Sequence, residues 1–200
     1  MSLFAKLQQR QAEARPIRVG LIGAGKFGSM YLAQIPRTPG VHLAGIADLS
    51  PDGVRTNLSR VGWQAQRMQA SSLDAAIKSG DTHIGEDWLA LVSHPAIDVI
   101  VECTGHPIAA VDHCLEAFAN GKHVVNVTVE ADAFCGPLLA LKAAQAGVVY
   151  SLAFGDQPAL ICDLVDWART CGFPVVAAGR GHKWLPHFSQ STPDTVWGYY

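Results

Sequence analysis

The sequence predicts an α/β fold with a doubly wound parallel sheet, and three observations support this prediction. Short apolar runs suited to buried strands recur along the chain, at 17–22, 97–103 and 123–127 among others. Segments of helical composition, ended by glycine or proline, separate them. A glycine-rich turn joins the first run to the first helix. Such alternation favours parallel strands, buried on both faces and joined by right-handed crossovers.

The turn after the first strand has GxGxxG spacing, formed by Gly23, Gly25 and Gly28. In this pattern the first glycine permits a tight turn and the second lets the backbone approach a pyrophosphate. The third lets the helix pack closely on the strand. Residues 29–35 read as that helix, which Pro36 ends. Phosphates would then lie on free N–H groups at the positive end of the helix dipole.

A second strand, expected at 41–47, leads into Asp48, which lies 20 residues after Gly28. A carboxylate at the tip of the second strand is where a dinucleotide fold holds the adenosine ribose hydroxyls. Alternatively, Asp48 caps the next helix, because Ser50-Pro51-Asp52 also looks like a helix start. The order of strand, glycines, helix and acid favours the first interpretation and predicts a Rossmann-type dinucleotide-binding domain.

Composition excludes several classes of protein. The 200 residues are 49% hydrophobic and 16% charged, with a net charge of −2. The chain can therefore bury a sizeable core, and it lacks the basic field expected for nucleic-acid or membrane partners. It also lacks a bilayer-spanning run and the apolar core of a signal peptide. The first residues form a short amphipathic helix, expected to pack on the domain through a stripe of Leu3, Phe4, Leu7 and Ala14.

The five cysteines lie mostly in apolar segments and include no CxxC pair, which indicates reduced core residues of a cytoplasmic protein rather than a disulfide or zinc framework. The eight histidines form no HExxH or closely paired set, so no metal site is predicted. His94, His106 and His113 are expected at helix edges, as satisfied structural residues. A metal recruited by Glu130, Asp156 and the substrate is the remaining alternative.

The rest of the chain supplies further elements. One helix is expected after Pro107, with a single apolar face made of Ile108, Val111, Leu115 and Phe118. Other helices are expected at 51–61, 71–78, 87–92, 137–146 and from 158 onward, and further strands at 82–84, 148–152 and 174–178. Residues 63–70 have no clear pattern.

The character of the chain changes at Gly155, after which polar and aromatic residues become dense. We therefore expect an N-terminal helix over 1–15, a dinucleotide-binding domain over 16–155, and the start of a substrate and dimerisation region over 156–200.

Several motifs together resemble a known family. Residues 20–28 (Gly-Leu-Ile-Gly-Ala-Gly-Lys-Phe-Gly), 98–105 (Asp-Val-Ile-Val-Glu-Cys-Thr-Gly) and 121–127 (Gly-Lys-His-Val-Val-Asn-Val) resemble the N-terminal domain of homoserine dehydrogenase-like and Gfo/Idh/MocA-type oxidoreductases. The motifs at 129–132, 147–152, 155–158 and 178–181 are similar to one branch, which includes 1-deoxy-D-xylulose 5-phosphate reductoisomerase-like enzymes and carries a C-terminal SAF-type domain. The resemblance covers nearly all of the chain, but only the first half of such a protein.

The resemblance implies a nicotinamide cofactor. The residues that would bind its pyrophosphate are Gly23, Ala24, Gly25, Lys26, Phe27 and Gly28. Cys103, Thr104 and Gly105 would line the nicotinamide ribose at the end of the fourth strand, because parallel sheets bind ligands at the carboxyl ends of their strands. Glu130, after the fifth strand, would lie near the nicotinamide. The alternative for Thr104-Gly105 is a simple strand-to-helix turn.

Asp48 predicts a preference for NAD(H), with NADP as the alternative cofactor. A carboxylate repels a 2′-phosphate and accepts hydrogen bonds from a free 2′-hydroxyl. Arg55 would soften this preference. Reductoisomerase-like members favour NADPH and carry basic residues at this position, so Asp48 departs from their pattern.

Hydride transfer at a carbonyl needs an acid/base group and charge stabilisation at oxygen, while the cofactor supplies the hydride. Lys183 lies amid aromatic residues that would partly desolvate it, and it is the predicted acid/base. The alternative is a solvated surface lysine. Asp156 and Glu130 would orient Lys183 or bind substrate hydroxyls, unless Asp156 only caps the helix that follows.

Arg180 and His182 would bind a phosphate or carboxylate of the substrate, and Asp194 would join them unless it only forms a turn. The predicted function is an NAD(P)-dependent oxidoreductase acting on a small polar hydroxy or keto compound, such as a sugar acid or sugar phosphate. One alternative is a reductoisomerase that couples isomerisation to reduction, and another is a regulatory domain that binds NAD(H) without turnover. The full-length protein is expected to be a homo-oligomer.

Overall fold

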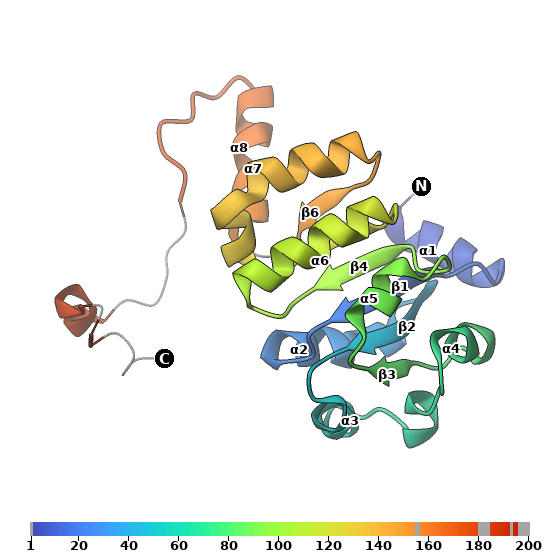
Figure 1. The fold of residues 1–200 in the computed structure, drawn as a ribbon. Coiled ribbons are helices and arrows are strands. Elements are labelled where there is room, and N and C mark those ends of the chain that lie inside the picture. Colours follow the sequence, from blue (N-terminus) through green and yellow to red (C-terminus); the bar gives the residue numbers. More distant parts are fainter. Residues whose placement is uncertain (1, 155–156, 180–184, 193, 196–200) are drawn as a thin grey trace. The chain divides into compact units, whose positions relative to one another are not determined.

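A computed structural model describes residues 2–154, 157–179, 185–192, 194 and 195, without the side chains of 157–159. By its internal contacts the chain divides into two compact units, Met1–Ala153 and Phe154–Tyr200 (Figure 1). The first unit holds a parallel sheet with helices on both of its faces. The second contains α8 (Gln157–Thr170) and a short 3-10 helix, η3 (Pro186–Gln190). No helix among the described residues is long and apolar enough to cross a membrane.

The sheet has six strands in the order β3-β2-β1-β4-β5-β6, and all five neighbouring pairs are parallel. The strands are β1 (Ile17–Ile22), β2 (Val41–Ala47), β3 (His83–Gly85), β4 (Val99–Glu102), β5 (His123–Asn126) and β6 (Tyr150–Leu152). The chain moves outward from β1 to β3 and then returns to place β4 on the other side of β1. Open sheets bind ligands beyond the carboxyl ends of the strands at such a reversal. The predicted doubly wound fold is confirmed.

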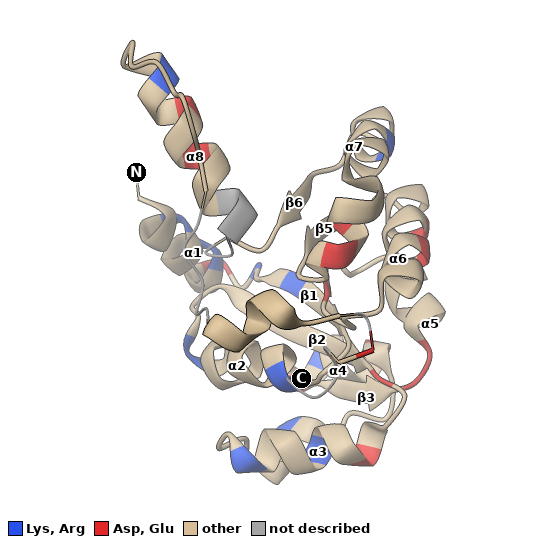
Figure 2. Cartoon of the chain, turned by 90° about the vertical axis from the view of Figure 1, so that its left-hand side faces the viewer, with Lys and Arg blue, Asp and Glu red and all other residues tan. Residues whose placement is uncertain are grey.

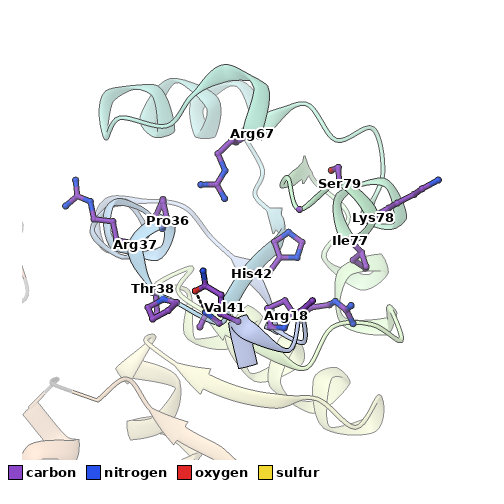
Figure 3. Close-up of a pocket in the computed structure, with 16 residues that line it drawn as sticks. Arg18, Pro36, Arg37, Thr38, Val41, His42, Arg67, Ile77, Lys78 and Ser79 are labelled. Carbon is purple, nitrogen blue, oxygen red and sulfur yellow. Dashed lines mark hydrogen bonds between the residues drawn. The ribbon is translucent and has the colours of Figure 1, made fainter. Parts of the chain in front are cut away.

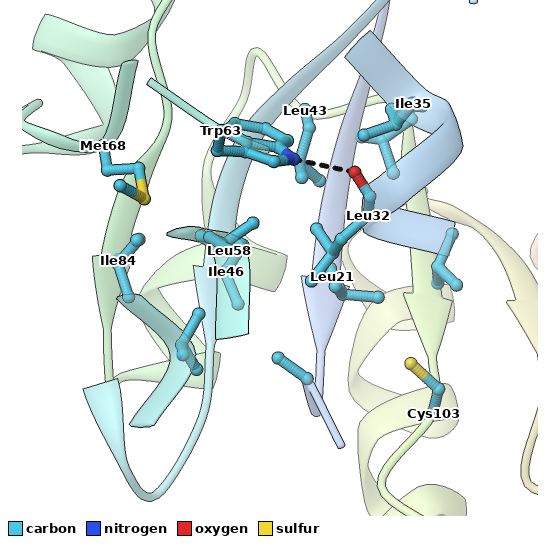
Figure 4. Close-up of a cluster of buried hydrophobic side chains, with 14 residues drawn as sticks. Leu21, Leu32, Ile35, Leu43, Ile46, Leu58, Trp63, Met68, Ile84 and Cys103 are labelled. Atoms are coloured by element: carbon cyan, nitrogen blue, oxygen red, sulfur yellow. Dashed lines mark hydrogen bonds between the residues drawn. The ribbon is translucent and has the colours of Figure 1, made fainter. Parts of the chain in front are cut away.

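One face of the sheet packs against α2 (Lys26–Gln34), the 3-10 turn η1 (Ile35–Arg37) and α3 (Pro51–Arg60). Trp63 and Met68 complete this core around the short 3-10 helix η2 (Ala65–Met68), in the segment that had no clear sequence pattern (Figure 4). The indole Nε1 of Trp63 donates a hydrogen bond to the carbonyl oxygen of Leu32 at 2.7 Å. A buried ring with a satisfied N–H fixes this irregular segment, because the ring fills the core without leaving a polar atom unpaired.

The opposite face packs against α4 (Leu73–Ser79), α5 (Trp88–Ser93), α6 (Pro107–Ala119) and α7 (Val129–Gln145). The prediction of which residues form the buried apolar face of α6 is wrong in part. Phe118 is buried and Val111 is partly buried, but Ile108 and Leu115 are 55% and 37% exposed. Smaller or polar side chains let α6 approach the sheet closely, and its remaining buried residues are Ala110, His113, Cys114 and Ala117.

The N-terminal helix α1 (Leu3–Ala12) makes less use of its apolar stripe than predicted. Leu3 and Phe4 remain exposed, and Ala14 lies beyond the helix with a positive φ of 52°. A polar contact attaches the helix to the turn before β2, since the backbone N–H of Gly40 donates to Gln11 Oε1 at 3.1 Å. The predicted apolar packing of the whole stripe is therefore wrong.

Two later elements also differ from the prediction. α7 begins at Val129 rather than at Pro137, and it contains a kink at Cys135 (φ −148°, ψ 24°) just before that proline. Residues 174–178 form no strand, and they pair with no other strand in the described part of the chain. An apolar run without a partner leaves its backbone groups outside a ladder, so composition by itself does not produce a strand.

All five cysteines are free thiols. Cys103 and Cys114 are buried and Cys135 is half-buried, but Cys162 and Cys171 are exposed. The predicted core position is therefore wrong for the last two cysteines, which lie on α8 or directly after it.

A thiol reagent at neutral pH is expected to label Cys162 and Cys171 quickly, and Cys103 and Cys114 only after unfolding. Burial is the main cause that raises the pKa of Cys103 and of Cys114 to about 12, and nearby carboxylates add to it. Both thiols therefore stay protonated at pH 7, whereas the thiolate is the reactive form. Mass spectrometry of peptides labelled with and without guanidinium measures this difference. Fast labelling of Cys103 in the folded protein would contradict it.

Candidate functional site

The glycine-rich loop turns between β1 and α2 at the carboxyl edge of the sheet. Gly23 has a φ of +86°, and a Cβ there would meet the backbone of Cys103 and Thr104 at 2.8 Å. A Cβ at Gly28 would lie 3.0 Å from the Gly23 carbonyl oxygen. Gly25 differs from both, because a Cβ there would have no neighbour within 4 Å. Close packing therefore requires glycine at positions 23 and 28. At position 25 the absence of a side chain instead leaves open space above the loop.

Helix α2 begins beside this open space with unpaired backbone donors. Its N-cap is Gly25, no side chain caps it, and its first turn contains no acidic residue. Ser29 is the first residue whose N–H finds an acceptor in this turn, at 2.9 Å from the Gly25 carbonyl oxygen. The N–H groups of Lys26, Phe27 and Gly28 have no partner within the helix. Such a helix start favours an anionic group.

Asp48 connects the loops that follow β1 and β2. Its Oδ2 accepts a hydrogen bond from the N–H of Ala24 at 2.8 Å, and its Oδ1 accepts one from the N–H of Ser50 at 2.8 Å. Ser50, rather than Asp48, is the N-cap residue of α3. Each carboxylate oxygen can still accept another hydrogen bond, so the side chain can support the loop and bind a hydroxyl group at the same time.

A fully buried carboxylate, Glu102, ends β4. Its Oε1 accepts hydrogen bonds from Thr104 Oγ1 at 2.6 Å and from His113 Nδ1 at 3.2 Å. Its Oε2 accepts one from Thr128 Oγ1, and that hydroxyl oxygen accepts one from the N–H of Gly105 at 3.0 Å. The loops after β4 and β5 are therefore joined through one carboxylate.

The hydrogen bonds continue from β5 to β6. Asn126 Oδ1 accepts from the N–H of Thr128 at 3.0 Å, and Asn126 Nδ2 donates to the hydroxyl oxygen of Tyr150 at 3.0 Å. The Tyr150 hydroxyl donates to Asp132 Oδ1 at 3.0 Å. Burial raises the pKa of Tyr150, so its hydroxyl keeps the proton that it donates. These bonds fix the start of α7 relative to the carboxyl edge of the sheet.

Comparison with known families gives this geometry a context. Residues 23–151 match the family described as "Homoserine dehydrogenase, NAD binding domain", which is more than half of the chain. The chain belongs to this NAD-binding family. Residues 155–199 match a second family, described as "Oxidoreductase DRL, catalytic domain". The chain is thus related to NAD(P)-binding oxidoreductases.

Two homoserine dehydrogenases are similar to the NAD-binding domain in sequence. The protein from Methylobacillus glycogenes is 34% identical over 113 residues, which is 56% of this chain and 24% of that protein. The protein from Pseudomonas aeruginosa is 27% identical over 135 residues, which is 68% of this chain and 28% of that protein. The chain therefore corresponds to about a quarter of the length of these relatives.

Solved structures share the fold of the NAD-binding domain. A homoserine dehydrogenase from Thiobacillus denitrificans matches with a TM-score of 0.54 at 24% identity, over 68% of this chain and 29% of that one. An NAD binding oxidoreductase from Klebsiella pneumoniae matches with a TM-score of 0.53 at 20% identity, over 78% of this chain and 39% of that one. At these identities the likeness shows the fold alone.

Within the NAD-binding domain, the structure brings three predicted segments together. Asp48 contacts the glycine loop as described, and Cys103 Sγ donates to the Gly23 carbonyl oxygen at 2.9 Å. Thr104 and Gly105 come directly after Cys103 in the sequence, and both are exposed to solvent. Glu130 is exposed at the start of α7 and makes no side-chain hydrogen bond with another described residue.

The remaining predicted catalytic and substrate residues belong to the second unit of the chain. Asp194 is exposed in the second unit. The other four lie outside the described residues, and they are Asp156, Arg180, His182 and Lys183.

Sequence reasoning missed the positioning residues Glu102 and Thr128. The available signal was an acidic residue at the end of an apolar strand, because a glutamate is almost never fully buried unless it is paired. His113 was expected at a helix edge, but it lies within α6, buried, with its ring centroid 4.6 Å from that of Trp88. His94 and His106 do lie at helix ends. In the described part of the chain, no group of three or more His, Cys, Asp or Glu side chains could hold a metal ion.

Proposed function

We propose that the NAD-binding domain holds the cofactor pyrophosphate on the first turn of α2 and the adenosine ribose at Asp48. The observation that carries this proposal is the open space above Gly25, directly beside a helix start without a cap. A pyrophosphate there would accept hydrogen bonds from first-turn amides. The ribose hydroxyls would reach the free acceptor sites of the Asp48 carboxylate.

We propose that NAD is preferred over NADP. A 2′-phosphate beside Asp48 would meet a like charge, which is unfavourable. We expect Arg55 to relieve only part of this repulsion, because its guanidinium already donates to Asp52 Oδ1 at 3.3 Å and to the Ile84 carbonyl oxygen at 3.4 Å. Its charge is therefore partly engaged by Asp52, an exposed partner on α3.

The loop after β4 would line the nicotinamide ribose through Thr104 and Gly105. Hydrogen bonds from Thr104 to Glu102 and from Gly105 to Thr128 hold that loop, so its conformation is set before a ligand binds. When bound, the nicotinamide supplies or accepts a hydride. The protein's part at this end of the site is to position the ring against the substrate.

We propose that the whole protein is an oxidoreductase for a small polar hydroxy or keto compound, of the sugar-acid or sugar-phosphate class. The match of residues 155–199 to an oxidoreductase catalytic domain supports this proposal. Lys183 would act as the acid/base and would be oriented by Asp156 and Glu130. The substrate anion would be bound by Arg180, His182 and Asp194. No feature of the described residues favours coupled isomerisation or cofactor sensing without turnover.

Fluorescence titrations with NADH and NADPH test the role of Asp48. The unmodified protein is expected to bind NADH about tenfold more tightly or better, since a charged hydrogen bond contributes ~1.5–3 kcal/mol. Asp48→Ser is expected to reduce that ratio about tenfold, because it removes the negative charge but keeps an oxygen for the Ala24 N–H. Asp112→Asn removes an exposed carboxylate of α6 and should leave the ratio unchanged. Tighter binding of NADPH by the unmodified protein would overturn the proposal.

A further inference from the structure

A pocket of about 600 Å³ lies at the amino edge of the sheet, where β1 and β2 begin (Figure 3). Arg18 and His42, near the starts of these strands, contribute to its lining, as do the turn at 36–40 and the end of α4 at 78–80. Its volume lies within the usual range for small-molecule sites. β2 has seven residues, so Asp48 lies about 20 Å away at the other end of the strand. We call this hollow the amino-edge pocket.

Four cationic side chains line the amino-edge pocket, and none of its lining residues is acidic. The cations are Arg18, Arg37, Arg67 and Lys78. Figure 3 shows Arg67 and His42 directed into the hollow, whereas Arg37 and Lys78 extend from opposite rims. Within the described residues, none of the four cations forms an ion pair.

The two side chains directed into the pocket, Arg67 and His42, are held in place without an acidic partner among the residues that the structure describes. Arg67 lies with its guanidinium carbon 5.5 Å from the centroid of the Trp63 ring, and Trp63 itself is fixed in the core. His42 Nε2 lies 2.7 Å from the Asp81 carbonyl oxygen. Stacking on an aromatic ring leaves all five N–H donors of a guanidinium available to a ligand.

The negative groups nearby do not cancel this charge. The Asp98 carboxylate accepts a hydrogen bond from the backbone N–H of Arg18 at 2.7 Å. Helices α1 and α4 end at the pocket, and each contributes about half a negative charge at its last carbonyls. Asp81 directly follows the lining residue Gly80, and with its carboxylate counted the negative contributions amount to about three charges against four cations. The chain as a whole has a net charge of −2, and residues of both signs are spread over its helices (Figure 2). A pocket whose charged lining residues are all cationic therefore differs from the rest of the surface.

We propose that the amino-edge pocket binds a small polyanion, carrying phosphate or carboxylate groups, at a site separate from the cofactor edge. Arginine recognises both kinds of group through paired N–H donors. A ligand of this kind would bind Arg67 inside the pocket and draw Arg18, Arg37 and Lys78 inward from its rims. It would connect η1, η2 and α4, which pack around the start of β2.

Titration of the 15N-labelled chain with inorganic pyrophosphate, followed by NMR, tests this proposal residue by residue. Saturable shifts are expected for the amides of Gly40, Val41, Ser79 and Gly80. Residue-level detection is needed because pyrophosphate can also bind the glycine loop at 23–28. A parallel titration with citrate distinguishes the two chemistries: saturation by either anion supports the site, and the tighter one identifies the preferred group.

Arg67→Gln is expected to weaken binding about tenfold or more, which is the effect of losing one charged hydrogen-bonding group. Lys78→Gln should weaken it several-fold, and its exposed position on α4 keeps the fold intact. Arg60→Gln is the matched control, because Arg60 is exposed at the end of α3 outside the pocket. Shifts confined to the glycine loop, shifts that never saturate, or equal effects of all three variants would overturn the proposal.

Discussion

Replacement of Gly25 by valine is expected to weaken NADH binding at least about 100-fold, while the free energy of unfolding changes by less than ~1 kcal/mol. The loss corresponds to two or more charged hydrogen bonds at ~1.5–3 kcal/mol each. The fold should tolerate the change because a Cβ at this position meets no atom within 4 Å and the backbone is extended, with a negative φ (φ −69°, ψ −152°). The added side chain would occupy only the space proposed for the pyrophosphate. Isothermal titration calorimetry and guanidinium unfolding measure the two quantities separately.

Gly23→Val is the matched comparison for that experiment. Gly23 has a positive φ, and its Cβ would collide with backbone atoms at the end of β4, so this variant should lose stability as well as binding. Gly25→Ala should show an intermediate loss of affinity with an unchanged fold. A Gly25→Val protein that binds NADH as well as the unmodified chain would refute the proposed pyrophosphate position.

Substitution of Glu102 by alanine is expected to lower the free energy of unfolding by about 3–5 kcal/mol, because buried hydrogen-bonding groups lose their partner and a cavity forms. Three side chains would lose their acceptor at once, namely Thr104, Thr128 and His113. A cavity would also remain at a fully buried position. Guanidinium unfolding followed by circular dichroism gives the measurement.

Two variants define the cause of this loss. Glu102→Gln keeps the shape but turns one acceptor into a donor, and it should cost about 1–3 kcal/mol. Glu86→Ala removes an exposed glutamate and should change stability by less than ~0.5 kcal/mol. The network would be unimportant for stability if Glu102→Ala resembled Glu86→Ala.

The parts of the site that could be predicted are those encoded locally. The spacing of Gly23, Gly25 and Gly28 requires only a strand, a turn and a helix within one short stretch, and the structure contains all three. Asp48 was predictable because the second strand must end beside the first. The structure adds that the same carboxylate supports the glycine loop through Ala24.

The parts that could not be predicted depend on contacts between distant residues. Glu102 meets Thr128 across 26 positions of sequence, and Trp63 reaches Leu32 across 31. Neither pair leaves a periodic pattern. The buried face of α6 was also mispredicted, because helix approach to the sheet selects small side chains rather than the largest apolar ones.

By itself the sequence determined the alternation of strands and helices, the parallel sheet and the turn that starts α2, because buried strands and glycine turns follow from local composition. Only the tertiary structure decided which charged groups are paired. It buried Glu102 among three donors, paired Arg55 with Asp52, and left Arg18 and Arg67 without an acidic partner in the described chain. The reason is that pairing depends on distance in space, and segments far apart in sequence meet only when the sheet brings them together.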